Sequence, residues 1–181
     1  LWNIGAEGQL FLGAIAGTWI GVNVDAFGTA SGEPVREELA ASSEELLLGY
    51  VGGLHESREL DTLISAYEKV DGPATRLLVI GDGRDRTALE AHAASIGLED
   101  EVTFTGSIPH SEIPSHLAAL DIGLAWIPDR PQYRNQPPLK TVEYLAAGLP
   151  VIATPTPGNL EFCSSRNSVL SSFETNPSDN R

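Results

Sequence analysis

Short apolar runs that close in glycine or proline alternate along this chain with stretches of helical periodicity. Five such runs cover residues 46–51, 76–80, 102–105, 121–127 and 150–154, and a weaker sixth covers 168–173. The runs are continuously apolar, which is typical of strands covered on both faces of a parallel sheet. Right-handed crossovers then give a doubly wound layer. The sequence therefore predicts an α/β fold with a Rossmann-like doubly wound parallel sheet.

The stretches between these runs predict amphipathic helices. Residues expected to face inward are Leu60, Leu63, Ile64, Tyr67 and Val70 in the first helix, and Leu139, Val142, Leu145 and Ala146 in the last. A helix around 86–96 is stopped by Gly97, and Ser111 is expected to cap the helix that follows the third strand. Residues 128–138 are polar and proline-rich, which predicts a loop.

The charge balance excludes several classes of protein. The 181 residues include 25 acidic and 11 basic ones, for a formal net charge of −14. Such a chain lacks the basic surface of a general nucleic-acid binder, and an anionic membrane would repel it. The single cysteine excludes an intrachain disulfide or a cysteine zinc site. Only Lys69 and Lys140 are lysines, and high acidity with few lysines suggests a salt-adapted cytoplasm as a hypothesis.

The two ends of the chain differ from its middle. Residues 1–21 form an apolar, glycine-rich segment that is too short to span a bilayer. This segment resembles part of the permease subunits of sugar or nucleoside importers; a buried soluble element, or a join between unrelated coding pieces, are the alternatives. Residues 22–45 are expected to be a linker, and 164–181 a truncated polar tail. Because the first residue is Leu1, we expect a piece of a longer chain.

The motif Gly81-Asp82-Gly83 follows the second predicted strand and precedes a helix. Glycines at this point let a backbone approach a diphosphate, and a helix N-terminus offers amide donors. A dinucleotide fingerprint would need a third glycine where this chain has Arg86, and an acidic residue after the next strand. A nicotinamide dehydrogenase is therefore not expected. A tight turn without a ligand remains an alternative.

A second candidate site surrounds Glu143 on the helix 139–147. The free amides of Lys140 and Thr141 at the start of this helix suit an anionic ligand. Glu143 lies about one turn further on, and its carboxylate can accept two hydrogen bonds from a ribose diol. The alternative is a solvated glutamate on an amphipathic helix.

Four segments stand in a characteristic order and spacing. They are VGGLHESRELDTLISAYEKV, LLVIGDGRDRTALEAHAASIGLEDEVTFTGSIP, LAALDIGLAW and PPLKTVEYLAAGLPVIATPTPGNLEF. Over residues 46–163 this order resembles the glycosyltransferases group 1, which are retaining, metal-independent nucleotide-sugar transferases with the GT-B fold. In that fold an N-terminal half holds the acceptor and a C-terminal half holds the donor. The resemblance implies a donor-binding domain over 46–163, one half of a GT-B fold, whose N-terminal acceptor domain is missing.

The resemblance also carries over a donor site residue by residue. Gly52 and Gly53 match the loop under the diphosphate, although the family usually has arginine where this chain has Gly53. Arg58 replaces a family lysine and keeps its charge, and Lys140 is the second predicted cation on the leaving diphosphate. The predicted catalytic residues are Arg58 and Lys140, and the predicted donor-binding residues are Gly52, Gly53, Gly81, Gly83, Gly106, Ile108, Thr141 and Glu143.

Within that set the resemblance assigns further roles. The turn containing Gly106 and Ile108 would hold the nucleobase through its backbone, and Glu143 would bind the ribose. The family often has a second glutamate where this chain has Asn135. No Asp-x-Asp sequence occurs, no metal or other cofactor is expected, and none of the four histidines has ligand spacing.

The expected function is the transfer of a sugar from a nucleotide diphosphate sugar to a hydroxyl acceptor with retention. The expected partners are that donor and the missing acceptor domain, without nucleic acid. We expect a cytoplasmic location, with membrane contact at most through the acceptor or residues 1–21. The alternatives are a nucleotide-sugar epimerase of the same fold and a non-catalytic interaction module in which the glycine turns are only structural.

Overall fold

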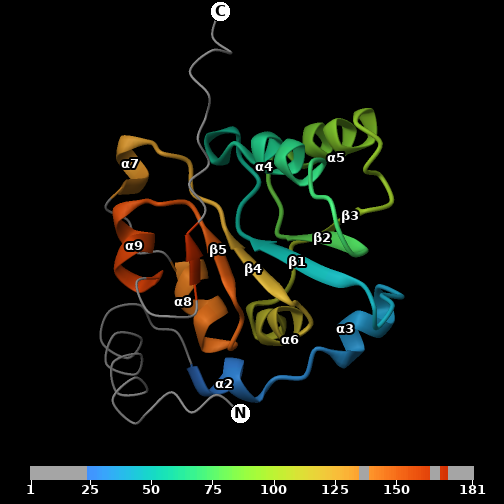
Figure 1. The fold of residues 1–181 in the computed structure, drawn as a ribbon, viewed down its shortest axis with the longest axis vertical. Coiled ribbons are helices and arrows are strands. Elements are labelled where there is room, and N and C mark those ends of the chain that lie inside the picture. Colours follow the sequence, from blue (N-terminus) through green and yellow to red (C-terminus); the bar gives the residue numbers. More distant parts are fainter. Residues whose placement is uncertain (1–23, 135–138, 164–167, 171–181) are drawn as a thin grey trace, which may run out of the picture.

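The computed structural model describes residues 24–134, 139–163 and 168–170. In this part of the chain six strands form one sheet in the order β3-β2-β1-β4-β5-β6, and every pairing is parallel (Figure 1). The strands are β1 (Leu46–Val51), β2 (Thr75–Ile80), β3 (Val102–Gly106), β4 (Ile122–Ala125), β5 (Val151–Ala153) and β6 (Ser168–Leu170). This is the doubly wound strand order, so the predicted fold class is confirmed.

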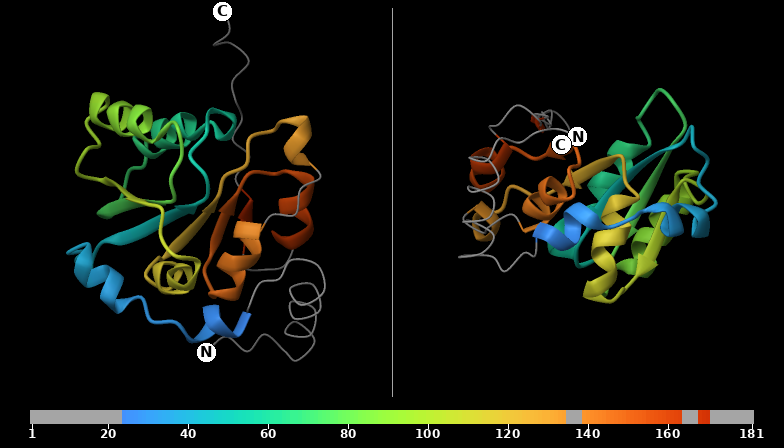
Figure 2. Two further views of the ribbon diagram at one scale, coloured as in Figure 1. Left: turned by 180° about the vertical axis from the view of Figure 1, so that it is seen from behind. Right: turned by 90° about the horizontal axis from the view of Figure 1, so that it is seen from below.

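Helices cover both faces of the sheet (Figure 2). The longer helices are α4 (Leu60–Tyr67), α5 (Arg86–Ser95), α8 (Leu139–Ala146) and α9 (Pro157–Cys163). The shorter ones are α2 (Val24–Thr29), α3 (Glu33–Glu38), η2 (Glu56–Arg58), η3 (His110–Glu112), α6 (Ile113–Ala118) and α7 (Pro131–Arg134). Helices α4 and α5 pack on one face, and α2, α6 and α8 on the other.

Burial on both faces explains why the strands read as continuous apolar runs. Neighbouring residues of β1 enter different cores: Leu48 packs beneath α4 and α5, whereas Leu47 packs beneath α6 and α8. Leu77 and Leu78 of β2 divide in the same way. No polar face is left on these central strands, so polar and apolar residues do not alternate along them.

Two local expectations, for Val70 and for Ser111, are corrected. Val70 lies after the end of α4 and is 47% exposed. Ser111 lies inside η3, and α6 begins after Glu112 without a side-chain cap. Pro114 in the first turn of α6 has no N–H to be capped, which lessens the need for a capping side chain.

The last predicted helix is present, but its inward face differs from the expectation. Leu139 is 48% exposed, whereas Thr141 and Tyr144 are fully buried. Thr141 is inward because its hydroxyl donates to Oδ1 of the buried Asn159 on α9 at 2.7 Å. The stretch 128–138, predicted as a loop, contains the short helix α7.

The ends of the chain lie partly outside the described residues. Residues 1–21 lie outside them, as does most of 164–181, although β6 falls within that predicted tail and pairs with β5. From residue 24 onward, the predicted linker 22–45 forms α2 and α3. Phe27 of α2 is 4% exposed and packs in the core with α6 and α8.

The strand order reverses between β1 and β4. These strands pair in register at Leu48 with Ile122 and at Gly49 with Gly123. The Tyr144 ring packs on Gly123, where a β-carbon would collide with it. The Tyr144 hydroxyl accepts a hydrogen bond from the Val51 amide at 2.9 Å and donates to the Gly49 carbonyl at 3.1 Å. A side chain of α8 thus bridges the two strands at the point of reversal.

Candidate functional site

The carboxyl ends of β1 and β4 meet at the reversal of strand order, which is where doubly wound sheets bind ligands. Trp126 directly follows β4 at this point. Its indole Nε1 donates to the Arg58 carbonyl at 2.8 Å, and its own carbonyl accepts from Nζ of Lys140 at 3.4 Å. One residue therefore holds both predicted catalytic segments at this edge of the sheet.

Arg58 ends the short helix η2, which follows the loop after β1. Its guanidinium carbon lies 4.5 Å from the centroid of the Tyr133 ring on α7. Tyr133 is itself fixed, because its hydroxyl donates to Oγ of Ser57 at 2.8 Å. The guanidinium is therefore placed by a ring, and no described carboxylate forms an ion pair with it.

Lys140 lies in the first turn of α8, with Nζ 3.9 Å from the centroid of the Tyr50 ring on β1. Burial, together with the nearby Arg58 charge, lowers the pKa of Lys140 to about 7, and the Glu143 carboxylate partly opposes this shift. The shift shows that the site disfavours further positive charge. A bound anion would offset the electrostatic cost of the Lys140 and Arg58 charges.

Glu143 lies one turn further along α8 and is partly buried. Burial raises the pKa of its carboxyl group above the usual range, and the charges of His110 and Lys140 partly oppose the shift. The structure therefore brings Arg58 into one electrostatically coupled cluster with Lys140 and Glu143, which lie far from it in sequence. The geometric requirement for the predicted site, that these three residues share one edge, is met.

Three residues of this site were not singled out from the sequence. Tyr50 and Tyr133 support the two cations, and His110 lies close enough to act on the Glu143 carboxyl. Tyr50 is fully buried, its hydroxyl has no partner among the described groups, and burial raises its pKa to about 12. The available signals were weak: an aromatic residue before Gly52-Gly53, and a histidine just after the third strand's turn.

The glycines that follow β1 and β2 pack the backbones of two loops together. A β-carbon on Gly81 would collide with the Gly52 carbonyl, and one on Gly83 would collide with the Leu54 carbonyl. The Leu54 amide donates to the Asp82 carbonyl at 3.0 Å. The requirement for glycine at positions 81 and 83 is thus accounted for by contacts within the protein, and a ligand role for these two residues remains a prediction.

The remaining predicted residues lie along the same edge. Gly106 ends β3 and forms an isolated bridge with Gly81, and Ile108 is partly buried just beyond it. Gly53 lies against the His55 ring. The Thr141 side chain is turned into the core, so its predicted role depends on its backbone amide alone.

Within residues 24–134, 139–163 and 168–170 there is no group of three His, Cys, Asp or Glu side chains arranged to hold a metal ion. Over the same residues, no helix has the length and apolar character that crossing a membrane requires.

Comparison with known proteins gives one family match and several relatives. The family model described as glycosyl transferases group 1 matches residues 45–177. A 2-deoxystreptamine glucosyltransferase from Streptomyces kanamyceticus is 36% identical over 109 residues, covering 59% of this chain and 27% of that protein. This chain thus matches only about a quarter of that relative's length.

A solved structure and a short match complete the comparison. The Anabaena protein Alr3699/HepE, solved in complex with UDP-glucose, has a TM-score of 0.65 at 22% identity, over 77% of this chain and 38% of that chain. At this identity the likeness shows the fold alone. A stretch of 24 residues, 13% of this chain, is 79% identical to 6% of the glucose ABC transporter permease protein TsgB13 from Haloferax volcanii. The predicted permease resemblance is therefore confirmed over a short stretch.

Proposed function

Since this chain belongs to the glycosyl transferases group 1, we propose that it binds the donor for transfer of a sugar from a nucleotide diphosphate sugar to a hydroxyl acceptor, with retention of configuration. The observation that carries this proposal is the cluster of Arg58, Lys140 and Glu143 at the β1–β4 reversal. The UDP-glucose complex of the Anabaena relative supports a nucleotide-sugar donor.

In this proposal the two cations hold the diphosphate. Negative charge develops on the diphosphate as the bond to the sugar breaks, and preorganised cations at that point stabilise the transition state. The Arg58 guanidinium can grip phosphate oxygens through two donors, whereas Lys140 acts as a point charge. The amides of Gly53, Gly81 and Thr141 would supply further donors. Those of Gly52 and Gly83 already donate to the Ile80 carbonyl at 3.0 Å and to Oδ1 of Asp82 at 2.7 Å, so these two glycines would contribute only a close approach of the backbone.

The nucleoside is proposed to lie on the other side of the diphosphate. The Glu143 carboxylate would accept hydrogen bonds from the ribose hydroxyls, and the backbone around Gly106 and Ile108 would contact the base. The acceptor-binding half would supply the attacking hydroxyl. No metal or other cofactor has a role in this proposal.

The first test is calorimetric titration of the chain with UDP and GDP. Glu143→Ala should weaken binding of whichever nucleotide binds by about 1–3 kcal/mol, because a charged hydrogen-bond acceptor is lost. Glu99→Ala, in the exposed turn before β3, is the matched control and should leave the affinity unchanged. Equal affinities for the Glu143→Ala variant and the unaltered chain would contradict the ribose role.

A second test separates the transferase from its alternatives. The donor-binding half, combined with an acceptor-binding half and a hydroxyl acceptor, should release free nucleotide and yield a glycosylated product with the donor's anomeric configuration. An epimerised donor without nucleotide release would instead show an epimerase. A folded chain that binds no nucleotide would favour an interaction module.

A further inference from the structure

Most arginines in the described part of the chain are matched with carboxylates. Five ion pairs are formed there, and their cations are Arg36, Arg76, Arg86 and Arg130. Neither Arg58 nor Lys140 belongs to any of them, although the chain has 25 acidic residues against 11 basic ones. The other cations outside these pairs whose side chains the structure describes, Lys69 and Arg84, are exposed, so Arg58 and Lys140 are the partly buried cations in this part of the chain whose placement needs another physical explanation.

Each of these two cations faces an aromatic ring. The Arg58 guanidinium carbon lies 4.5 Å from the Tyr133 ring centroid, and Lys140 Nζ lies 3.9 Å from that of Tyr50. Both distances lie within the range in which a ring quadrupole attracts a cation. A ring attracts the cation without carrying a net opposite charge, so the positive charge of Arg58, and that of Lys140 while it is protonated, remains available to an anion.

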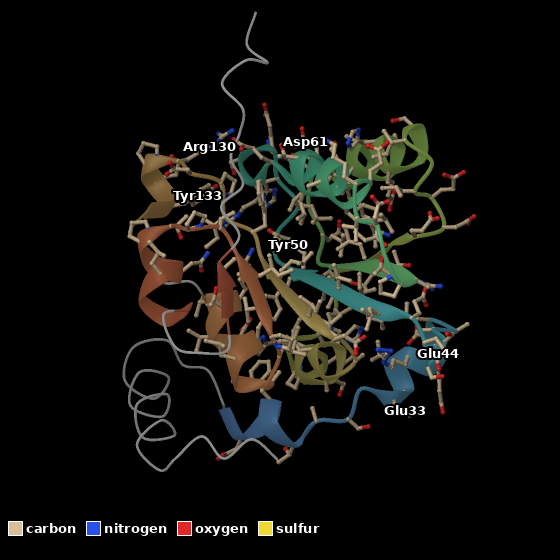
Figure 3. The ribbon with its side chains drawn as sticks, viewed as in Figure 1. Glu33, Glu44, Tyr50, Asp61, Arg130 and Tyr133 are labelled. Carbon is tan, nitrogen blue, oxygen red and sulfur yellow. The ribbon has the colours of Figure 1, made fainter. Side chains whose placement is uncertain are left out.

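The segment that carries Tyr133 is hydrogen-bonded to both sequence neighbours of Arg58. Its hydroxyl donates to Ser57, the residue before Arg58, at 2.8 Å. Arg130, which precedes α7, donates to the carboxylate of Glu59, the residue after Arg58, at 2.7 Å. Tyr133 and Arg130 lie together beside α7 in Figure 3. Two hydrogen bonds therefore join the segment 130–133 to the turn 57–59, and the Tyr133 ring lies against the Arg58 guanidinium.

The Tyr50 ring is held by the sheet. Tyr50 lies in β1, is fully buried and packs in the core beneath α4 (Figure 3). Its hydroxyl has no hydrogen-bond partner among the described groups, so hydrogen bonding does not explain a tyrosine at this position. The contact that distinguishes this side chain is the one between its ring and the Lys140 ammonium.

We propose that Tyr50 and Tyr133 are positioning residues that hold Lys140 and Arg58 at the anion site by their rings, without neutralising them. This inference rests on the proposed function, because it assumes that the anion is the donor's diphosphate. A glutamate in either position would also hold its cation, but its charge would oppose binding of the phosphate. The rings thus give order to two flexible side chains while preserving the attraction for the ligand.

The test is a set of paired substitutions, with inorganic pyrophosphate, UDP and GDP as probes in calorimetry. Tyr50→Phe retains its ring and should bind each probe within about twofold of the unaltered chain. Tyr133→Phe retains its ring but loses the hydrogen bond to Ser57, so its affinity should lie between those of the unaltered chain and Tyr133→Leu. Tyr50→Leu and Tyr133→Leu lose the rings and should bind pyrophosphate about tenfold more weakly. Tyr133→Glu, which would hold Arg58 but neutralise it, should bind no better than Tyr133→Leu.

A spectroscopic readout separates positioning from a merely structural role. The chain has two lysines, so the ε-methylene NMR signals of Lys140 and Lys69 can be assigned by single substitutions. The Lys140 signal should be shifted upfield by the ring current in the unaltered chain and in Tyr50→Phe, and should move toward that of Lys69 in Tyr50→Leu. If Tyr50→Leu does not fold, the affinities of the Tyr133 variants and the Lys140 signal in Tyr50→Phe still test whether the rings position the cations.

The outcomes distinguish this inference from the proposed function. If the unaltered chain binds pyrophosphate, UDP or GDP and the folded leucine variants bind equally well, the rings do not position the cations and the inference is overturned. If the folded, unaltered chain binds none of the three probes, the proposed function itself fails.

Discussion

The two edges of the sheet use their cations in different ways. At the amino edge Arg36 pairs with Asp121, whose Oδ2 also accepts the Leu47 amide at 2.8 Å, and Arg76 pairs with Glu45. At the carboxyl edge Arg58 and Lys140 lie against rings and pair with no described carboxylate. At the amino edge positive charge joins α3, β1 and β4. At the carboxyl edge Arg86 and Arg130 are paired with carboxylates as well, and Arg58 and Lys140 are the two cations whose charge we propose serves a ligand.

Among the variants that test this difference between the two edges, Lys140→Met is expected to change pyrophosphate affinity the most. Loss of a charged donor should weaken pyrophosphate binding by about 2 kcal/mol, or about thirtyfold. The free energy of unfolding should stay equal or rise, since a partly buried ammonium is removed. Calorimetry and urea denaturation measure the two quantities.

The matched control is Lys69→Met, at the chain's other lysine, which is exposed after α4. It should change neither quantity. Unchanged pyrophosphate binding by Lys140→Met, or a large loss of stability, would remove the distinction between the two edges.

The next effect is an opposite pH dependence of binding and stability. The pKa of Lys140 is about 7 in the folded protein against 10.5 ordinarily. Pyrophosphate affinity should therefore fall severalfold between pH 7 and 9, as the ammonium loses its proton. Over the same range the unfolded chain binds more protons than the folded one, so stability should rise with pH.

Titrations and denaturation curves across this pH range check both trends, with Lys140→Met as the reference. In that variant both pH dependences should be much reduced. Trends that persist unchanged in the variant would assign them to other groups.

The smallest effect is expected at the amino edge. Arg36→Met should lower the free energy of unfolding by about 1 kcal/mol and the melting temperature by about 3 °C, since a partly exposed pair is lost. Affinity for pyrophosphate should not change, because Arg36 lies at the other end of the sheet. A binding loss comparable to that of Lys140→Met would break the contrast.

Much of the fold could be predicted because its strands are buried on both faces, and such burial leaves continuous apolar runs in the sequence. The errors arose where a distant partner overrides local periodicity. Thr141 faces inward because Asn159 offers its amide oxygen, and no spacing within the helix reveals a partner on α9. Val70 was assigned to a helical face although the chain leaves the helix before it.

The candidate site was predictable to a smaller extent. Arg58, Lys140 and Glu143 follow from a familiar order of motifs, and the structure places them together. Tyr133 was not predicted because its ring reaches Arg58 from 75 positions further along the chain. Conversely, Gly81 and Gly83, the most conspicuous motif, are accounted for by the packing of two loops.

The Tyr144 side chain, whose hydroxyl bonds to β1 and whose ring packs on Gly123 of β4, has a consequence for how the nucleoside side of the site responds to heat. Tyr144 is the neighbour of Glu143 on α8, so the helix that carries the carboxylate is fastened to the hydrogen-bonded backbone of the sheet. Warming should therefore not loosen the ribose contact ahead of the sheet. On heating, nucleotide binding and the folded sheet should be lost in the same unfolding transition.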